Sequence, residues 1–281
     1  MIVSLPQRLI LFMLVAAGPL LLIVVPIGAF LAMSFFRMEN QQIVHDLSLA
    51  NYASFFSSWT YVKTLLLTLW LCAEVTLIGL LIGYPIAYFI WRRSGRTRTI
   101  LLLLFVLPLF MSYIVKIFTM RSILGLNGFL NQILVGLGLL SEPSQVFLYN
   151  QNAILFTMAV IFLPFVILPI YLSLERIPRS LVQASADLGA DIGTTFWHVI
   201  LPLSAPGTIA GALFAFVLAL GDFITPQMVG GANGFTFGRV IWSQFGLAYN
   251  WPFGAALGTV LLAVALLAII LGGIAAQRQR V

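Results

Sequence analysis

Long apolar runs alternate with short polar segments along almost the whole chain. No charged residue lies between Arg98 and Lys116, or between Asn152 and Leu174. At about 1.5 Å per helical residue, about 20 residues cross a hydrocarbon core of about 30 Å. The charges, prolines and polar loops that bound these runs predict six helical spans, at about 10–35, 64–91, 99–119, 153–174, 204–226 and 252–275. The first run is too long for a signal sequence and lacks a small-residue cleavage site, so it too is interpreted as a span.

Composition supports a protein that lies in the membrane. The 281 residues are 61% hydrophobic and 8% charged, whereas about 25% of the residues of a soluble domain are charged. No convincing internal repeat and no low-complexity tract divides the chain. The sequence therefore predicts an all-α, polytopic membrane protein that forms a single domain over residues 1–281.

The basic residues predict the orientation, because they favour the cytoplasmic side of short loops. With the N-terminus inside, nine of the fourteen lysines and arginines are cytoplasmic. These nine are Arg8, Arg92, Arg93, Arg96, Arg98, Arg176, Arg179, Arg278 and Arg280. Both termini are then cytoplasmic. This asymmetry accounts for the net charge of +6, so the charge gives no reason to expect a nucleic-acid partner.

One polar segment, "QASADLGADIGTTFWHVILPLSAPG" at residues 183–207, stands out between two apolar runs on the predicted cytoplasmic side. Ser180, followed three residues later by Gln183, predicts a helix that begins with a capping box. Gly189 predicts the end of that helix after about two turns, because glycine tolerates positive φ. The segment therefore predicts a short, structured helix in the loop.

Two faces are predicted for this helix from helical spacing. Leu181, Ala184 and Leu188 share an apolar face, and Gln183, Asp187 and Asp191 share a polar one. A second helical piece is predicted at about 194–200, followed by interruptions of the chain at Pro202 and Pro206. A structured but ordinary connector remains an alternative interpretation of the segment.

The same segment resembles the EAA loop of ABC-importer permeases. That pattern has Glu-Ala-Ala, three residues, Gly, nine residues and then Ile-x-Leu-Pro. Here it is Gln183-Ala184-Ser185, then Gly189, then Val199-Ile200-Leu201-Pro202, with Gln183, Ser185 and Val199 as mild departures. Tyr84–Pro108, Leu163–Pro178, "SADLGAD" and Asn250–Ala256 resemble the spermidine/putrescine subfamily of these permeases.

The resemblance implies a type I ABC-importer permease fold, a bacterial inner-membrane location, and transport of a small cation, a polyamine such as spermidine or putrescine. It implies four kinds of partner: a cytoplasmic ATP-binding ATPase dimer, a second and different permease subunit, an external substrate-binding protein, and membrane lipid. It also implies that the loop at 175–207 couples to the ATPase. The coupling residues carried over are Gln183, Ala184, Ser185, Asp187, Leu188, Gly189, Ala190 and Pro202.

Chemistry within the chain itself is not expected. A Walker loop ends Gly-Lys-Ser/Thr, whereas the two lysines, Lys63 and Lys116, each follow valine. ATP and Mg²⁺ are therefore expected in the partner ATPase, and no cofactor or catalytic residue in this chain. His45 and His198 have no second histidine or cysteine at a metal-ligand spacing, so no metal site is predicted. Cys72 is interpreted as a packing residue.

The alternatives from other classes are an ion-coupled secondary transporter and an intramembrane enzyme. The first usually has ionisable relays in several spans, and no HExxH or nucleophile elbow supports the second. An ABC permease for another small solute also remains open.

Glu74 and Asp222 are the only plausible acids inside the predicted spans, so they are the candidates for the substrate path. A carboxylate at a helix centre costs about 2.5–3.5 kcal/mol on insertion scales, so each is expected to face a cavity or a partner. For Asp222 the alternative is a structural hydrogen-bond pair with Arg239 or with a tyrosine. For Glu74 the alternative is hydrogen bonding between helices. Lys116 is interpreted as a snorkelling anchor.

Overall fold

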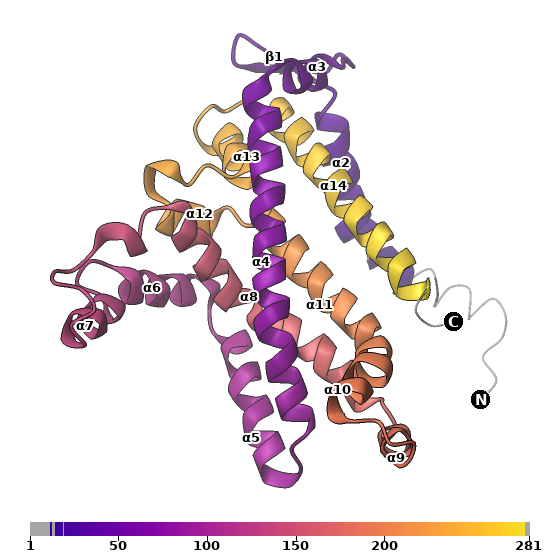
Figure 1. Ribbon diagram of the computed structural model, residues 1–281. Coiled ribbons are helices and arrows are strands. Elements are labelled where there is room, and N and C mark those ends of the chain that lie inside the picture. The colour runs from indigo at the N-terminus through magenta and orange to yellow at the C-terminus, as the bar shows by residue number, and fades with distance from the viewer. Residues whose placement is uncertain (1–11, 13–14, 19, 279–281) are drawn as a thin grey trace. The chain divides into compact units, whose positions relative to one another are not determined.

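The computed structural model describes residues 12, 15–18 and 20–278, which are almost entirely helical (Figure 1). The chain divides into two compact units. The first comprises residues 1–62 and 240–262, and the second residues 63–239 and 263–281. Three helices, α4 (Trp59–Trp91), α13 (Phe237–Gly246) and α14 (Trp251–Arg278), run from one unit into the other. Predicted cytoplasmic Arg8 and Arg280 lie outside the described residues.

The first unit contains a short hairpin between helices. Its elements are the π turn η1 (Leu20–Val24), α2 (Val25–Met33), β1 (Arg37–Glu39), β2 (Gln42–Val44) and α3 (Ala50–Ser57). The strands are antiparallel, and Asn40 and Gln41 take positive φ values of 48° and 62° in the turn, as two-residue hairpin loops require. The side-chain amide of Asn51 donates to the carbonyls of Ser34 and Phe36 at 2.9 and 2.8 Å. These bonds hold the start of α3 against the base of the hairpin.

The second unit is built around α8 (Gln151–Glu175). Its other elements are α5 (Gly95–Val106), η2 (Leu107–Phe110), α6 (Tyr113–Leu124), α7 (Phe129–Gly136), η3 (Gln145–Phe147), α9 (Arg179–Asp187), α10 (Ile192–Thr195), the π turn η4 (Phe196–Ile200), α11 (Leu201–Gly221), α12 (Ile224–Val229) and η5 (Gly231–Asn233). Buried Ile167, Ile170 and Leu174 of α8 form the centre of its core.

Small residues let two helices approach α8 closely. On α11, Gly207, Gly211, Ala215 and Ala219 recur every four residues and are buried. A Cβ on Gly211 would lie 2.9 Å from the carbonyl oxygen of Val166, and one on Gly83 of α4 would lie 3.0 Å from a methyl carbon of Val166. Such spacing of small residues is typical of close helix crossings in membranes. Val166 therefore lies between α4 and α11.

We expect Gly207→Leu to destabilise this packing. A Cβ on Gly207 would lie 2.4 Å from both the carbonyl oxygen of Pro169 and the Cβ of Ser173, so α11 must move away from α8. Overpacking of this kind costs about 1–3 kcal/mol, which is measured as a lower free energy of unfolding in detergent. Gly273→Ala is the matched control, because a Cβ on Gly273 would meet no atom within 4 Å. Equal stability of the two variants would contradict the close crossing.

Among the described residues, five helices are long and apolar enough to cross a membrane, and one bent pair makes a sixth span if it is counted as one. The five are Val15–Met33, Trp59–Trp91, Gln151–Glu175, Ile192–Gly221 and Trp251–Gln277. The predicted all-α fold is confirmed, with the start of the first span, from residue 10, outside the described residues. One domain over 1–281 stays a prediction.

The third predicted span, 99–119, is wrong as a straight helix. The segments Gly95–Phe110 and Tyr113–Gly136 meet at 103°. Pro108 has no N–H to donate, and its carbonyl accepts from the N–H of Met111 at 3.2 Å in a tight 3₁₀ turn, after which Met111 is extended. The turn and the extended residue together end the first helix.

The predicted interruptions at Pro202 and Pro206 are also wrong. Both prolines lie in the first two turns of α11, within a helical span that is continuous from Ile192 to Gly221. The π turn η4 directly precedes α11, whose second residue is Pro202. Its wider spacing of hydrogen bonds lets a helix pass a residue that disturbs the regular ladder. The helix that begins at Ile192 is therefore connected to the membrane span without a break.

Candidate functional site

The loop helix α9 ends as the sequence predicts. The N–H of Gly189 donates to the carbonyl of Ala186 at 2.9 Å, and the N–H of Ala190 donates to that of Ser185 at 3.1 Å. These two bonds form a Schellman motif, which needs a left-handed residue after the helix. Gly189 supplies it with φ of 81°, and a Cβ there would meet no atom within 4 Å. A side chain at Gly189 would thus add backbone strain without a clash.

The predicted capping box at the start of α9 is wrong. The N-cap is Pro178, and no side chain caps the helix. Ser180 is the second helical residue, so its backbone already has helical geometry and its side chain is not placed to cap.

A cap occurs at the next helix instead. Asp191 is the N-cap of α10 and accepts from the N–H of Thr194 at 2.8 Å. Hydrogen bonds from the side chain and backbone of Thr194 hold the pKa of Asp191 below its usual value, so the cap stays charged at neutral pH. Because Asp191 follows the end of α9, the predicted polar face shared with Gln183 and Asp187 is wrong at this position.

The apolar face of α9 points away from the chain. Leu181 is 44% exposed and Leu188 is 89% exposed. On the opposite side, the hydroxyl of Ser185 bonds that of Thr195 in α10 at 2.9 Å, and Val182 packs towards the core. Exposed apolar surface of this kind is typical of interaction sites.

The eight predicted coupling residues lie in two places. Gln183, Ala184, Ser185 and Asp187 are in α9, Leu188, Gly189 and Ala190 form the turn after it, and Pro202 is in the first turn of α11. Seven of the eight therefore lie within residues 183–190, whereas Pro202 belongs to the start of the membrane span. Within the described part of the chain, Ser185 is the one residue of this set whose side chain bonds another element of the loop.

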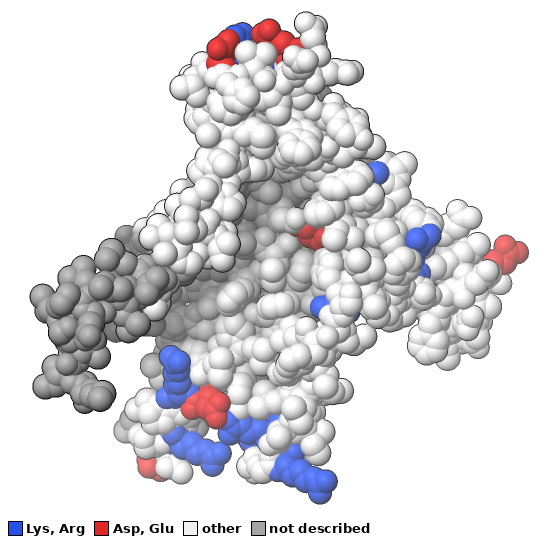
Figure 2. Space-filling view, turned by 180° about the vertical axis from the view of Figure 1, so that it is seen from behind, with Lys and Arg blue, Asp and Glu red and all other residues white. Residues whose placement is uncertain are grey.

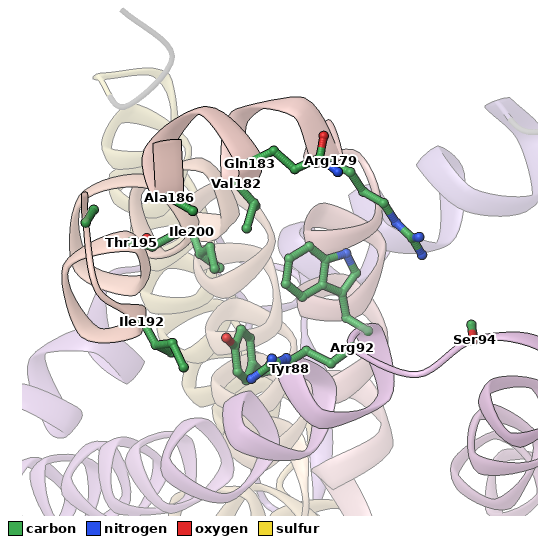
Figure 3. Close-up of a pocket in the computed structure, with 12 residues that line it drawn as sticks. Tyr88, Arg92, Ser94, Arg179, Val182, Gln183, Ala186, Ile192, Thr195 and Ile200 are labelled. Carbon is green, nitrogen blue, oxygen red and sulfur yellow. The ribbon is translucent and has the colours of Figure 1, made fainter. Parts of the chain in front are cut away.

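A groove of about 420 Å³ separates α9 from the last turns of α4 (Figure 3). Val182, Gln183 and Ala186 line it on the α9 side, and Tyr88 and Arg92 line it on the α4 side. Figure 2 shows basic side chains gathered at this end of the second unit, below a surface that carries little charge. That distribution agrees with the positive-inside pattern of the sequence.

Asp222 lies at the opposite end of α11, at a break between helices. It is the C-cap of α11, so the predicted continuation of the span to residue 226 is wrong. One carboxylate oxygen accepts from the N–H groups of Ile224 and Thr225, the first two residues of α12, at 3.0 and 3.1 Å. The other accepts from the hydroxyl of Tyr113 at 2.5 Å. Asp222 is only 8% exposed.

The tyrosine alternative for Asp222 is thus realised, and the Arg239 alternative is wrong. Arg239 donates instead to the carbonyls of Gly231 and Gly234, both at 3.1 Å. Asp222 nevertheless also lines a groove of about 520 Å³ between α6, α8 and α11. Asp222 therefore makes structural hydrogen bonds and also faces a cavity.

The groove beside Asp222 is otherwise apolar except for two residues of α6. Tyr113 and Lys116 line it, together with side chains such as Phe162, Phe165 and Leu218. Sequence reasoning treated Lys116 only as an anchor and did not select Tyr113. The signal available was the tyrosine directly after the proline-containing break in an apolar run.

Glu74 is not brought to this groove. It accepts a hydrogen bond from the indole N–H of Trp70, one turn earlier on α4, at 2.8 Å. Trp70 is 63% exposed, so the pair lies on an outer face of its helix. The structure therefore separates the two acids that the sequence put forward together.

A second cluster missed by the sequence lies near the start of α5 and the end of α8. Arg98 donates hydrogen bonds to the hydroxyl of Tyr171 and to the carboxylate of Glu175, with which it forms an ion pair. Two turns of α8 are thereby fastened to the base of α5. The sequence assigns Arg98 only to a basic cytoplasmic loop, because its two partners lie more than 70 residues away in the chain.

These features define a class: a polytopic helical membrane protein with a structured loop helix at one end of a span and a buried carboxylate at the other. Residues 75–281 match the family described as "Binding-protein-dependent transport system inner membrane component". The chain belongs to this family, and it is a multi-pass inner-membrane transport permease.

Individual relatives agree with this assignment. The chain is 35% identical to the spermidine/putrescine transport system permease protein PotB of Haemophilus influenzae over 246 residues, which are 86% of this chain and 85% of the relative. It is 35% identical to the inner membrane ABC transporter permease protein YdcU of Escherichia coli, over 86% and 82% of the two chains. A bacterial ABC transporter that imports alginate has the same fold, with TM-score 0.74 and 17% identity over 97% of this chain and 96% of that one.

Proposed function

We propose that this chain is a membrane-spanning permease subunit of an ATP-driven importer that carries a polyamine-like cation inward. The substrate class follows from the spermidine/putrescine permease relative, and the buried carboxylate of Asp222 offers the negative charge that an ammonium needs in an apolar groove. The family assignment favours this importer over an ion-coupled transporter. ATP and Mg²⁺ bind a separate ATPase, and a second permease and an external binding protein complete the complex.

The observation that carries the proposal is the connection between α9 and Asp222. The exposed apolar face of α9 is offered to the ATPase, and one continuous span, Ile192–Gly221, leads from the loop to the residue before Asp222. Displacement of α9 by a closing ATPase dimer is then passed along α11 to the groove. No catalytic step by this chain is required, either at α9 or in the groove beside Asp222.

Purification and uptake test the proposed function. The tagged chain, isolated from bacterial membranes with mild detergent, is expected to bring an ATPase subunit with it, and proteoliposomes of the complex with its binding protein should take up labelled putrescine only with ATP. Butane-1,4-diol, which has the same chain length without the ammonium groups, is the matched control solute. Uptake that follows an ion gradient without ATP would instead support the secondary transporter.

Orientation is tested with single cysteines in a Cys72→Ala background. Ser94, Ser180 and Leu47 are exposed positions. We expect Ser94→Cys and Ser180→Cys to react with a membrane-impermeant maleimide only from the cytoplasm, and Leu47→Cys only from outside. Labelling of Leu47→Cys and Ser180→Cys from the same side would contradict the six-span topology with cytoplasmic termini.

A further inference from the structure

The groove beside Asp222 already contains a cation. Lys116 is the one positively charged residue among those that line it, and it lies one turn after Tyr113 on α6, so both side chains share a helix face. Its ammonium lies over the ring of Tyr113, with Nζ 5.7 Å from the ring centroid. The hydroxyl of the same tyrosine donates to Asp222 at 2.5 Å. Tyr113 thus bears a cation on its ring face and an anion at its hydroxyl.

The cation and the anion are not paired with each other. The ion pairs found among the described residues involve Arg37 and Arg98, and none includes Lys116 within 4.0 Å. In the same part of the chain, Arg121 donates to Tyr149 and Arg239 donates to backbone carbonyls. Lys116 is half-buried and has no such acceptor in the described structure. Its contact is the π-face of Tyr113, which attracts an ammonium.

A flexible four-carbon stem lets a lysine ammonium take several positions around a fixed Cα. In this groove the alternatives are the ring of Tyr113 and the carboxylate of Asp222. An ammonium of the substrate that enters the groove seeks the same two groups, and like charges repel strongly where water is scarce. Occupancy of the carboxylate by the lysine and by the substrate is therefore mutually exclusive.

We propose that Lys116 is a tethered competitor for the substrate's ammonium: it lies over the ring of Tyr113, as in this structure, moves onto the carboxylate of Asp222 to displace a bound substrate ammonium, and then returns to the ring. The inference rests on the proposed function, because it assumes that Asp222 meets the transported cation. Its consequence is that Lys116 weakens binding in the groove and so speeds release. The ligand class is a primary or secondary ammonium ion with an apolar chain.

Inhibition by product on the cytoplasmic face tests the proposal in the complete importer. Proteoliposomes are preloaded with increasing spermidine on that face, and uptake of labelled spermidine is measured at saturating binding protein. Lys116→Gln removes the competing charge, so half-inhibition is expected at about tenfold lower spermidine than in the wild type. Lys116→Arg keeps a cation and is expected to stay within about twofold of the wild type.

Two further variants separate the outcomes. Lys116→Gln combined with Asp222→Asn is expected to lose the tenfold shift, because the lysine acts through that carboxylate. If Asp222→Asn alone leaves uptake unchanged, the proposed substrate path is wrong. If Asp222→Asn impairs uptake but Lys116→Gln leaves half-inhibition unchanged, or raises the spermidine needed, only the competitor role is wrong and Lys116 is an anchor.

If the Lys116→Gln complex does not assemble, chemical modification of a cysteine at this position tests the proposal instead. Lys116→Cys in the Cys72→Ala background is treated with a methanethiosulfonate reagent that adds either an ethylammonium or a neutral group of similar size. The ammonium adduct is expected to restore wild-type inhibition, whereas the neutral adduct is expected to keep the tenfold shift. Equal inhibition of the two adducts would overturn the proposal.

Discussion

Asp222→Asn is expected to lower ATP-driven uptake of a spermidine-like cation by about tenfold or more. Asparagine keeps an oxygen that accepts from the N–H groups of Ile224 and Thr225, so these bonds at the start of α12 are preserved. It removes the one carboxylate that lines the groove. A tenfold loss corresponds to about 1.4 kcal/mol of lost transition-state stabilisation, a small part of the cost of an uncompensated ammonium in apolar surroundings.

Initial uptake rates in proteoliposomes measure this effect, with copurification of the other subunits as the check on assembly. Glu74→Gln is the matched control, because Glu74 is also a carboxylate within an apolar helix but is bonded to Trp70 rather than placed in the groove. Glu74→Gln is therefore expected to transport normally. If both variants transport normally, no acid within the spans is essential, and a neutral or anionic solute becomes the better assignment.

Features that depend on one residue and its chain neighbours were predictable from the sequence. Gly189 ends α9 with positive φ, as expected for a glycine after a short helix, and the apolar runs give the membrane helices. The wrong predictions about local structure arise where the same short segment could begin or continue a helix in two ways. Pro178 starts α9 before Ser180, and a π turn carries the helix past Pro202, neither of which the residue types specify on their own.

Features that depend on distant pairs were not predictable. Tyr113 and Asp222 are 109 residues apart in the chain, and a single sequence contains no signal that relates them. The same holds for the close approach of Gly83 and Gly211 to Val166. The acid was identified because a charge in an apolar run is costly wherever it lies. Its partner and its neighbouring lysine depend on how α6 folds back after the bend.

Gly189→Val is expected to lower transport and substrate-stimulated ATP hydrolysis together while leaving the protein inserted. The Schellman turn holds residue 189 at φ of 81°, where a β-branched residue costs about 1–3 kcal/mol, and relief of this strain rotates the exposed apolar face of α9 away from its partner. Transport and substrate-stimulated ATP hydrolysis should therefore fall together, measured on the same proteoliposomes. Gly95→Val is the matched control, because Gly95 has φ of 60° and open space around its Cβ position in another turn. It imposes similar strain outside α9, so transport and substrate-stimulated hydrolysis should both stay near the wild-type rates. Normal stimulation in Gly189→Val would show that the loop is only a connector, and an equal loss in Gly95→Val would attribute the effect to general strain.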